Sequence, residues 1–195
     1  MLGLAFIVLG YFAGSIPTGV LLAGRAGIDL REEGSGNVGA TNVARTAGTG
    51  LGVLTLIGDL LKGLVPVLLA RTLDFDLTVV AAVAVAAIIG HVFPIFLQFQ
   101  GGKGVATGFG VLLGLAPSAS LIALAVFVTA VAVTRIVSIG SMAAASSAPL
   151  AVFLFGYPTP IVTAATVIGV LILWRHRDNF SRLLAGTEEP FRARD

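Results

Sequence analysis

Long uninterrupted stretches of apolar residues are the feature that most limits what this chain can fold into. A helix needs roughly 20 apolar residues to cross the hydrocarbon core of a bilayer, where its backbone polar groups must be satisfied internally. Hydrophobic residues make up 56% of the chain and charged residues only 11%, which leaves too little polar surface to cover a water-soluble globule. We therefore predict an all-α polytopic membrane protein that forms a single domain over residues 1–195.

The apolar stretches predict a bundle of about seven spans. The expected spans are residues 2–23, 51–70, 77–97, 105–115, 118–134, 138–155 and 159–174. The fourth span is short enough to be a half-helix, and five or six crossings result if short segments are re-entrant. The first residues lack the basic region that opens a signal peptide, so the first stretch is expected to remain as a span.

Proline and glycine add detail to this bundle. Pro17, Pro66 and Pro94 lie inside apolar stretches and predict kinked helices. Glycines that recur at four-residue spacing predict close contacts between helices. These pairs are Gly10/Gly14, Gly48/Gly52, Gly104/Gly108 and Gly110/Gly114.

The positions of the cations predict the orientation. If the N-terminus lies outside, ten of the twelve Lys and Arg residues fall on the inner side: Arg25, Arg31, Arg45, Lys103, Arg135, Arg175, Arg177, Arg182, Arg192 and Arg194. The outer loops hold only Arg71, and Lys62 lies within a span. Since cytoplasmic loops carry an excess of Lys and Arg, we predict an odd number of crossings and a cytoplasmic C-terminus. The net charge of +2 then reflects topology, and no nucleic-acid partner is expected.

Three polar segments, residues 34–42, 101–107 and 174–179, are expected to emerge on this inner side. Glycine lets backbone N–H groups approach an anion closely, and Lys, Arg, Ser and Asn side chains add further donors. The combination predicts a site for phosphate-bearing substrates at one membrane face. No cysteine is present, and two histidines without neighbouring carboxylates do not indicate a metal site, so no metal or cofactor is expected.

Each segment also has a plainer interpretation. The first could be a flexible turn in which Asn and Ser bond their own backbone, or an anion nest with Arg45 as counter-charge. In the second, Lys103 is followed by Gly104, which does not match a nucleotide-binding P-loop. What remains there is a glycine turn that opens a helix, or a lysine that serves topology alone.

The third segment reads as a stop-transfer cluster, which explains its arginines but neither His176 nor Asn179. Asp59 and Lys62 lie three residues apart in the second span, so they form either a structural pair or part of a functional site. Ser141 is an ordinary packing residue by type, yet it is expected on the same side as the loops.

Taken together, the segments resemble the signature motifs of the bacterial acyl-phosphate-dependent glycerol-3-phosphate acyltransferases, the PlsY family. The first motif is matched by Gly34, Ser35, Gly36, Asn37, Gly39, Thr41, Asn42 and Arg45. The second is matched by Gly90, His91, Pro94, Gly101, Gly102, Lys103, Gly104, Val105, Ala106 and Thr107. The third is matched by Arg175, His176, Arg177, Asn179, Arg182, Leu183, Gly186 and Glu188. The match extends over nearly the whole chain in order and spacing.

The resemblance implies a reaction and a location. Such enzymes transfer a fatty acyl group from acyl phosphate to the 1-hydroxyl of glycerol 3-phosphate, which yields lysophosphatidic acid and inorganic phosphate and begins phospholipid synthesis. The site would face the cytoplasm at the bacterial inner membrane. Expected partners are the two substrates, membrane lipids and, through functional coupling, the enzyme that produces the acyl phosphate.

The resemblance also implies roles. Ser35, His176 and Asn179 are the expected catalytic residues, and Glu188 is expected to brace the tail. Lys103 and the backbone of residues 101–104 would hold the phosphate of glycerol 3-phosphate. The remaining expected substrate-binding residues are Gly34, Gly36, Asn37, Thr41, Asn42, Arg45, Gly101, Gly102, Gly104, Thr107 and Ser141.

The proton acceptor has two candidates, His176 and the phosphate of the donor. We favour the donor phosphate, since Ser35 as a covalent nucleophile would need an adjacent base that its motif does not show. A transporter of a phosphorylated solute is the competing class of protein, although transport sites lie near the bilayer midplane rather than at one face. A non-catalytic lipid-binding subunit would explain the tail but not three polar motifs.

Overall fold

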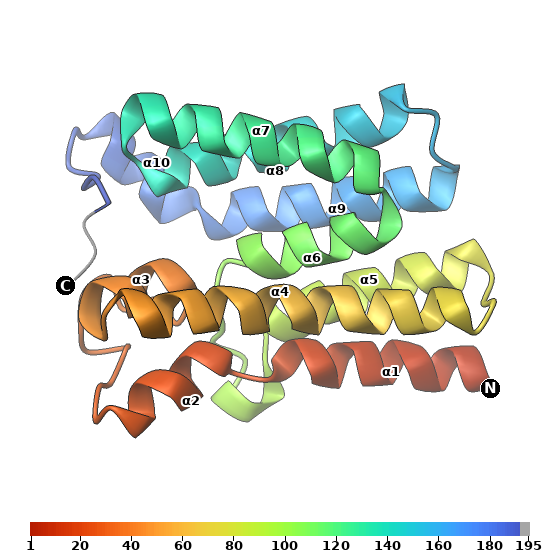
Figure 1. Ribbon diagram of the computed structural model, residues 1–195, viewed down its shortest axis with the longest axis horizontal. Coiled ribbons are helices and arrows are strands. Elements are labelled where there is room, and N and C mark those ends of the chain that lie inside the picture. The colour runs from red at the N-terminus through yellow and green to blue at the C-terminus, as the bar shows by residue number, and fades with distance from the viewer. Residues whose placement is uncertain (192–195) are drawn as a thin grey trace.

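In the computed structural model, which describes residues 1–191, helices are the only regular secondary structure within that range (Figure 1). They are α1 (Leu2–Ser15), α2 (Thr18–Arg25), α3 (Ala40–Thr46), α4 (Thr49–Thr72), α5 (Leu77–Val92), the 3-10 turn η1 (Ile95–Leu97), α6 (Val105–Leu115), α7 (Pro117–Thr134), α8 (Val137–Leu154), α9 (Thr159–Arg175) and α10 (Arg177–Leu184). The predicted all-helical class is confirmed. Arg192 and Arg194 of the predicted inner cations lie outside the described residues.

Within the described residues, five segments are long and apolar enough to cross a membrane: Leu2–Arg25, Thr49–Thr72, Leu77–Leu97, Pro117–Thr134 and Val137–Leu154. A sixth results if α9 and α10, which are bent by 52°, count together. Helix α6 has 11 residues and covers about half of a bilayer core, as a half-helix would. The expected count of seven crossings stays a prediction.

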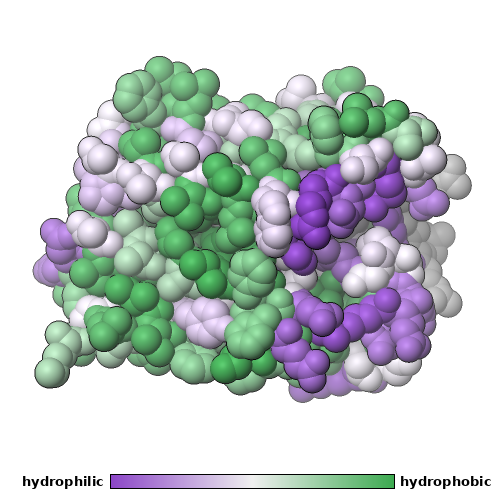
Figure 2. Space-filling model, turned by 180° about the vertical axis from the view of Figure 1, so that it is seen from behind, coloured by the Kyte–Doolittle hydropathy of each residue, from purple (hydrophilic) through white to green (hydrophobic). Residues whose placement is uncertain are grey.

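The helices run along the long axis of the molecule, and the N-terminus and α10 lie at opposite ends (Figure 1). Helices α2, α3 and α10 gather at one end (Figure 1), and on the face shown in Figure 2 the hydrophilic surface concentrates at that end while green hydrophobic surface prevails over the rest. Opposite ends for the N-terminus and α10 agree with an odd number of crossings. Which end faces the cytoplasm stays a prediction that rests on the cations.

The prolines act in three different ways. Pro17 separates α1 from α2, and Pro94 follows the end of α5 and begins the 3-10 turn. Pro66 lies inside the continuous helix α4. The first and third predicted spans are therefore broken near the polar end of the bundle, because proline removes a backbone donor and clashes with the preceding turn.

Glycines let two pairs of helices pack closely. At Gly14 and Gly90, an added Cβ atom would overlap a backbone carbonyl of the facing helix in the α1–α5 pair. Gly63 and Gly110 do the same for α4 and α6. The expected packing role is confirmed for two pairs, Gly10/Gly14 and Gly110/Gly114. Gly48 and Gly104 differ from the prediction, since they precede α4 and α6 with φ angles of 93° and 83°.

Candidate active site

A cavity of about 680 Å³ is lined by α4 and α6 on one side and by α7, α8 and α9 on the other. Its polar part is lined by residues of all three polar segments, among them Ser35, Asn37, Lys103, His176 and Asn179, and by Arg45, Ser141 and Glu188 from outside those segments. Its apolar part is lined by side chains that include Leu56, Leu60, Phe109, Leu112, Phe127, Ala144, Ala148 and Ile168. One cavity thus joins a cationic end to a groove that suits a hydrocarbon chain.

A chain of charge-assisted hydrogen bonds organises the polar end. The Nζ atom of Lys103 donates to Oδ1 of Asn179 at 2.5 Å, and Nδ2 of Asn179 donates to Oε1 of Glu188 at 2.6 Å. Glu188 also accepts from Oγ of Ser138 and from Nε of Arg182, each at 2.6 Å. Glu188 thus contacts α8 and α10 directly, and through Asn179 it is connected to the loop before α6; its bracing role stays a prediction.

The pKa values of this chain follow from burial and from neighbouring charges. Burial, together with the nearby Arg182 cation, lowers the pKa of Lys103 to about 8. Burial alone would raise the pKa of Glu188, but hydrogen bonds from Ser138, Asn179 and Arg182 lower it below its ordinary value. Near neutral pH both groups are charged, so the site presents a lysine ammonium whose partners hold it in place.

The loop of residues 101–104, called the glycine loop below, is held on two sides. Backbone N–H groups of Gly101 and Gly102 donate to the α5 carbonyls of Val92 and His91 at 3.1 and 3.2 Å. Their carbonyls accept from Arg175, at 2.8 Å for Gly101 and 3.1 Å for Gly102. These two N–H groups are therefore committed to α5. The donors left for an anion are the Lys103 side chain and the first amides of α6, which lack helical partners.

The first polar segment is held mainly by its own asparagines. Oδ1 of Asn42 accepts from the Ser35 backbone N–H at 2.9 Å, and its amide group donates to two carbonyls of the same loop. Oδ1 of Asn37 accepts from the Gly39 backbone N–H at 2.9 Å. The plainer interpretation, in which Asn side chains bond their own backbone, is thus correct for both asparagines. Ser35 remains exposed at the rim of the cavity, where Thr41 also contributes to the lining.

Arg45 and Ser141 also line the polar end. Nη2 of Arg45 lies 3.5 and 3.4 Å from the carbonyls of Glu189 and Pro190, in the segment that follows α10. The Ser141 hydroxyl donates to Val137 within α8 at 2.8 Å, which leaves its oxygen as an acceptor.

His176 is 2% exposed and connects α9 with α10. Its Nδ1 lies 2.8 Å from the carbonyl of Ile172, so Nδ1 carries the proton and Nε2 is left as an acceptor. Burial lowers the pKa of His176 to about 4, although the bond to Ile172 acts in the opposite direction. The imidazole is therefore neutral near pH 7.

Four of the expected substrate-binding residues do not line the cavity: Gly36, Gly101, Gly102 and Thr107. Thr107 is fully buried, and its hydroxyl lies 3.0 Å from Nδ1 of His91, on the side of α6 that faces α5. Conversely, Ser138 and Arg182 line the cavity without having been assigned a role. Ser138 lies three residues before Ser141, and that helical spacing is the signal that could have found it.

A bundle of membrane-length helices with a lysine, arginine and histidine pocket at its polar end defines an integral membrane protein built to handle a phosphate and an apolar chain together. The sequence profile of the family described as "Glycerol-3-phosphate acyltransferase" matches residues 4–186, and the chain belongs to that family. It is therefore an acyltransferase whose acceptor is glycerol 3-phosphate. The family favours this class over the transporter that the sequence left open.

The relatives agree over almost the full length. A glycerol-3-phosphate acyltransferase of Geobacter sulfurreducens is 52% identical over 190 residues, which are 97% of this chain and 98% of the relative. A crystal structure of PlsY (YgiH), an integral membrane glycerol 3-phosphate acyltransferase in its glycerol 3-phosphate form, has a TM-score of 0.95 at 42% identity and covers 98% of this chain and 96% of that one. The lysophosphatidic acid form of that enzyme has a TM-score of 0.93 at 41% identity, with the same coverage.

Proposed function

We propose that this acyltransferase takes its acyl group from an acyl phosphate and transfers it to the 1-hydroxyl of glycerol 3-phosphate. The observation that carries the proposal is the continuous 680 Å³ cavity, in which Arg45 and Lys103 line the polar part and five helices line an apolar groove. Both proposed substrates carry phosphate, so cations and N–H donors must offset their repulsion. The products are lysophosphatidic acid and inorganic phosphate, and the reaction takes place at the cytoplasmic side of the bacterial inner membrane.

Glycerol 3-phosphate binds with its phosphate against Lys103 and the first amides of α6, with Arg45, Ser141 and His176 around it. The similar enzyme with forms described for glycerol 3-phosphate and lysophosphatidic acid supports these two molecules as substrate and product here. A lysine ammonium and helix amides form charge-assisted bonds to a phosphate dianion. The existing bond from Lys103 to Asn179 aims the ammonium before the substrate arrives.

The acyl phosphate places its chain in the apolar groove and its head near the first segment. Ser35 and Asn37 bind this head, since both line the cavity rim and the Asn37 amide nitrogen is free of the bond that Oδ1 makes. Asn179 orients the reacting groups. Because the acyl phosphate is reactive towards water, we include functional coupling to the enzyme that produces it.

The reaction forms one ester bond and breaks one anhydride bond. The 1-hydroxyl oxygen attacks the acyl carbonyl carbon, the bond from that carbon to the phosphate oxygen breaks, and the hydroxyl proton leaves with the phosphate. His176, with a pKa of about 4, is a weak base, and the phosphate becomes the stronger one as the anhydride bond breaks and negative charge builds on its oxygen. Nε2 of His176 therefore accepts a hydrogen bond and orients the hydroxyl, while position and electrostatics supply the rate enhancement.

The test is turnover by the purified protein in a lipid-like phase with palmitoyl phosphate and glycerol 3-phosphate. We expect phosphate release that requires both substrates and matches the lysophosphatidic acid formed. Palmitoyl-CoA, offered as the alternative donor, should give no product. Lys103→Ala should abolish turnover, whereas Arg25→Gln, an exposed cation that ends α2 and does not line the cavity, should leave it unchanged.

Two results would contradict the proposal. Turnover with palmitoyl-CoA but not with palmitoyl phosphate would replace the donor. No turnover by folded protein, together with saturable uptake of glycerol 3-phosphate into proteoliposomes, would support the transporter instead.

A further inference from the structure

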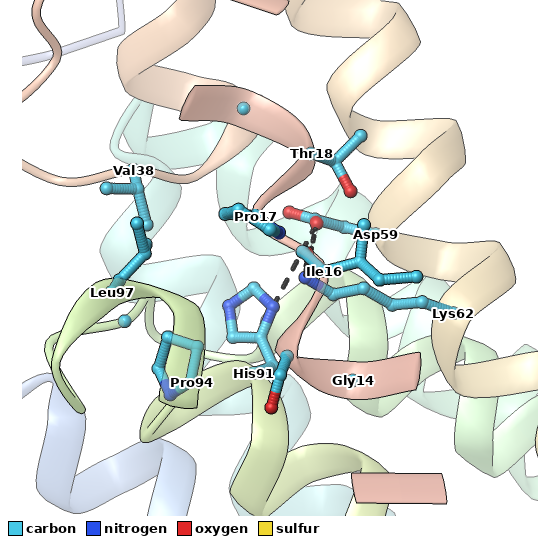
Figure 3. Close-up of a pocket in the computed structure, with 13 residues that line it drawn as sticks. Gly14, Ile16, Pro17, Thr18, Val38, Asp59, Lys62, His91, Pro94 and Leu97 are labelled. Carbon is cyan, nitrogen blue, oxygen red and sulfur yellow. Dashed lines mark hydrogen bonds and ion pairs between the residues drawn. The ribbon is translucent and has the colours of Figure 1, made fainter. Parts of the chain in front are cut away.

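Two charged side chains, Asp59 and Lys62, lie inside the membrane-spanning helix α4 and are separate in the chain from Lys103 of the glycine loop. Asp59 is 3% exposed, and its Oδ1 lies 2.8 Å from Nζ of Lys62. Ionisable residues within spanning segments are costly to bury and mark functional sites more often than solvent-facing ones do. Both side chains and His91 line a small cavity of about 10 Å³ between α1, α4 and α5. Figure 3 shows the three side chains pointing toward one another.

The pair is part of a larger network. Nζ of Lys62 also donates to the Ile16 carbonyl at 2.8 Å, at the break between α1 and α2. Nδ1 of His91 lies 3.9 Å from Oδ1 of Asp59 and 3.0 Å from the hydroxyl of Thr107. One chain of contacts therefore runs from the α1–α2 break through α4 and α5 to the first turn of α6.

His91 connects this network to the glycine loop. Its carbonyl accepts from the Gly102 backbone N–H at 3.2 Å, and its ring fills the space that a Cβ atom on Gly102 would occupy. Lys103 is the next residue along the chain. Because the Gly102 backbone bonds and packs directly against His91, a shift of His91 would move Gly102 and, with it, the neighbouring Lys103.

Asp59 and His91 line the 680 Å³ cavity as well as the small one, so the network forms part of the wall that faces the substrates. A lone carboxylate at that wall would repel both phosphates. The ion pair with Lys62 neutralises it, and in a low-dielectric interior such compensation is stronger than in water.

We propose that Lys62, Asp59, His91 and Thr107 are positioning residues, which fix the glycine loop so that Lys103 meets the phosphate of glycerol 3-phosphate. This inference rests on the proposed role of Lys103. A purely structural ion pair would instead hold the helices together without any effect on substrate affinity. The two alternatives differ in whether KM for glycerol 3-phosphate changes in correctly folded protein.

The test compares variants that keep or remove the contact at Nδ1 of His91. In His91→Leu the bond to Thr107 is lost, and KM for glycerol 3-phosphate should rise about tenfold or more with kcat reduced less, since a small misplacement of a binding group is costly. In His91→Asn an amide atom reaches the position of Nδ1, so KM should stay within about threefold of the unaltered enzyme. Thr55→Val, a buried threonine one turn from Asp59 whose hydroxyl bonds its own helix, is the control.

A second pair guards against a variant that fails to fold. Thr107→Val keeps the volume of the side chain and loses its hydroxyl, so KM for glycerol 3-phosphate should rise. Thr107→Ser keeps the hydroxyl, so KM should stay near that of the unaltered enzyme. Lys62→Met should raise KM further, because the carboxylate of Asp59 is left uncompensated at the cavity wall. Adding Asp59→Asn to Lys62→Met should lower KM again.

The outcomes separate this inference from the proposed function. Unchanged KM in folded His91→Leu and Thr107→Val, beside an impaired Lys103→Ala, would overturn the network's positioning role and leave the function intact. A lower yield of folded protein with unchanged KM would also overturn it. An active Lys103→Ala would instead contradict the role of Lys103 on which the inference rests.

Discussion

The two glycine-rich segments beside the cavity are alike in sequence but held in opposite ways. The glycine loop is fixed through its backbone by α5 carbonyls on one side and by Arg175 on the other. Residues 34–36 are exposed, and the Ser35 backbone N–H is held by Asn42 of the same segment. Similar composition therefore produces one rigid wall and one adaptable rim, because only the first is packed among spanning helices.

The difference suits the two substrates proposed. Glycerol 3-phosphate is small, soluble and the same in every turnover, so a preorganised site lowers the entropic cost of binding it. The acyl phosphate arrives from the bilayer with a long tail already placed by the groove. Its head needs a site that tolerates variation in position, which a loop of exposed glycines and short polar side chains provides.

The largest difference between the two segments is expected from matched glycine substitutions. At Gly102 a Cβ atom would overlap the His91 ring, so in Gly102→Ala the loop or the ring that it packs against must shift. A displacement near 1 Å can cost about 100-fold, and we expect that loss in kcat/KM for glycerol 3-phosphate. At Gly36 the nearest atom to a Cβ is the Arg31 carbonyl oxygen at 3.3 Å, so Gly36→Ala meets one tight contact that a shift of a few tenths of an ångström relieves, together with the strain of its φ of 70°.

Steady-state kinetics in a lipid-like phase would measure both variants, with Gly24→Ala, where a Cβ meets nothing within 4 Å, as the control. Gly36→Ala should lose only severalfold, in proportion to a strain of about 1 kcal/mol. Equal losses in Gly102→Ala and Gly36→Ala would mean that the two segments are equally constrained.

A pH profile distinguishes the two segments, because only the glycine loop carries a cation that titrates, Lys103. Phosphate binding needs the protonated ammonium, and burial lowers the pKa of Lys103 to about 8. The protonated fraction falls as pH rises through that value, so kcat/KM for glycerol 3-phosphate should fall about tenfold for each unit above it.

Lys103→Arg should remove this alkaline limb while retaining a positive charge, since arginine does not titrate in this range. Non-enzymatic hydrolysis of acyl phosphate, measured without protein at each pH, is subtracted. A flat profile from neutrality to pH 10 in the unaltered enzyme would show that Lys103 is not the cation that binds the acceptor.

Much of the bundle was predictable because periodic apolar runs directly report helices that lipid surrounds. The expected ranges for α7, α8 and α9 differ from the structure by only a residue or so at their ends. The breaks at Pro17 and Pro94 were placed but interpreted as kinks, since sequence alone does not say whether tertiary contacts will satisfy the freed backbone. Helices α3 and α10 were not predicted, because both are short and polar and take their stability from packing on α4 and α9.

The site was harder to predict in detail than in outline. Three motifs indicated the polar face, and the cavity brings most of their residues together. Whether Gly101 presents its N–H to a phosphate or to Val92 depends on the distance to another helix, which no local pattern contains. The same is true of Thr107, whose partner His91 lies 16 residues earlier. Resemblance to a family identifies such residues, but only the packing of the helices shows whether their polar groups point toward the cavity or toward another helix.

Ser35→Ala tests whether the first polar segment binds the head of the acyl phosphate. Loss of a hydroxyl that bonds a charged head should raise KM for acyl phosphate about tenfold and leave KM for glycerol 3-phosphate unchanged. Ser181→Ala, an exposed serine of α10 that does not line the cavity, is the matched control. An acyl-enzyme that is trapped in the unaltered protein and absent in Ser35→Ala would contradict this role and make Ser35 a nucleophile.

The smallest effect is expected at His176, which is buried at the polar end of the cavity but is not part of the glycine loop. His176→Gln can still place an acceptor near the position of Nε2, so kcat should be largely retained while KM for glycerol 3-phosphate rises about fivefold, the worth of one neutral hydrogen bond. Because burial lowers the pKa of His176 to about 4, removing the ring should leave the acidic limb of the pH profile above that value unchanged. Complete loss of turnover with unchanged acceptor binding would instead identify His176 as the general base, and the donor phosphate would then not be the proton acceptor.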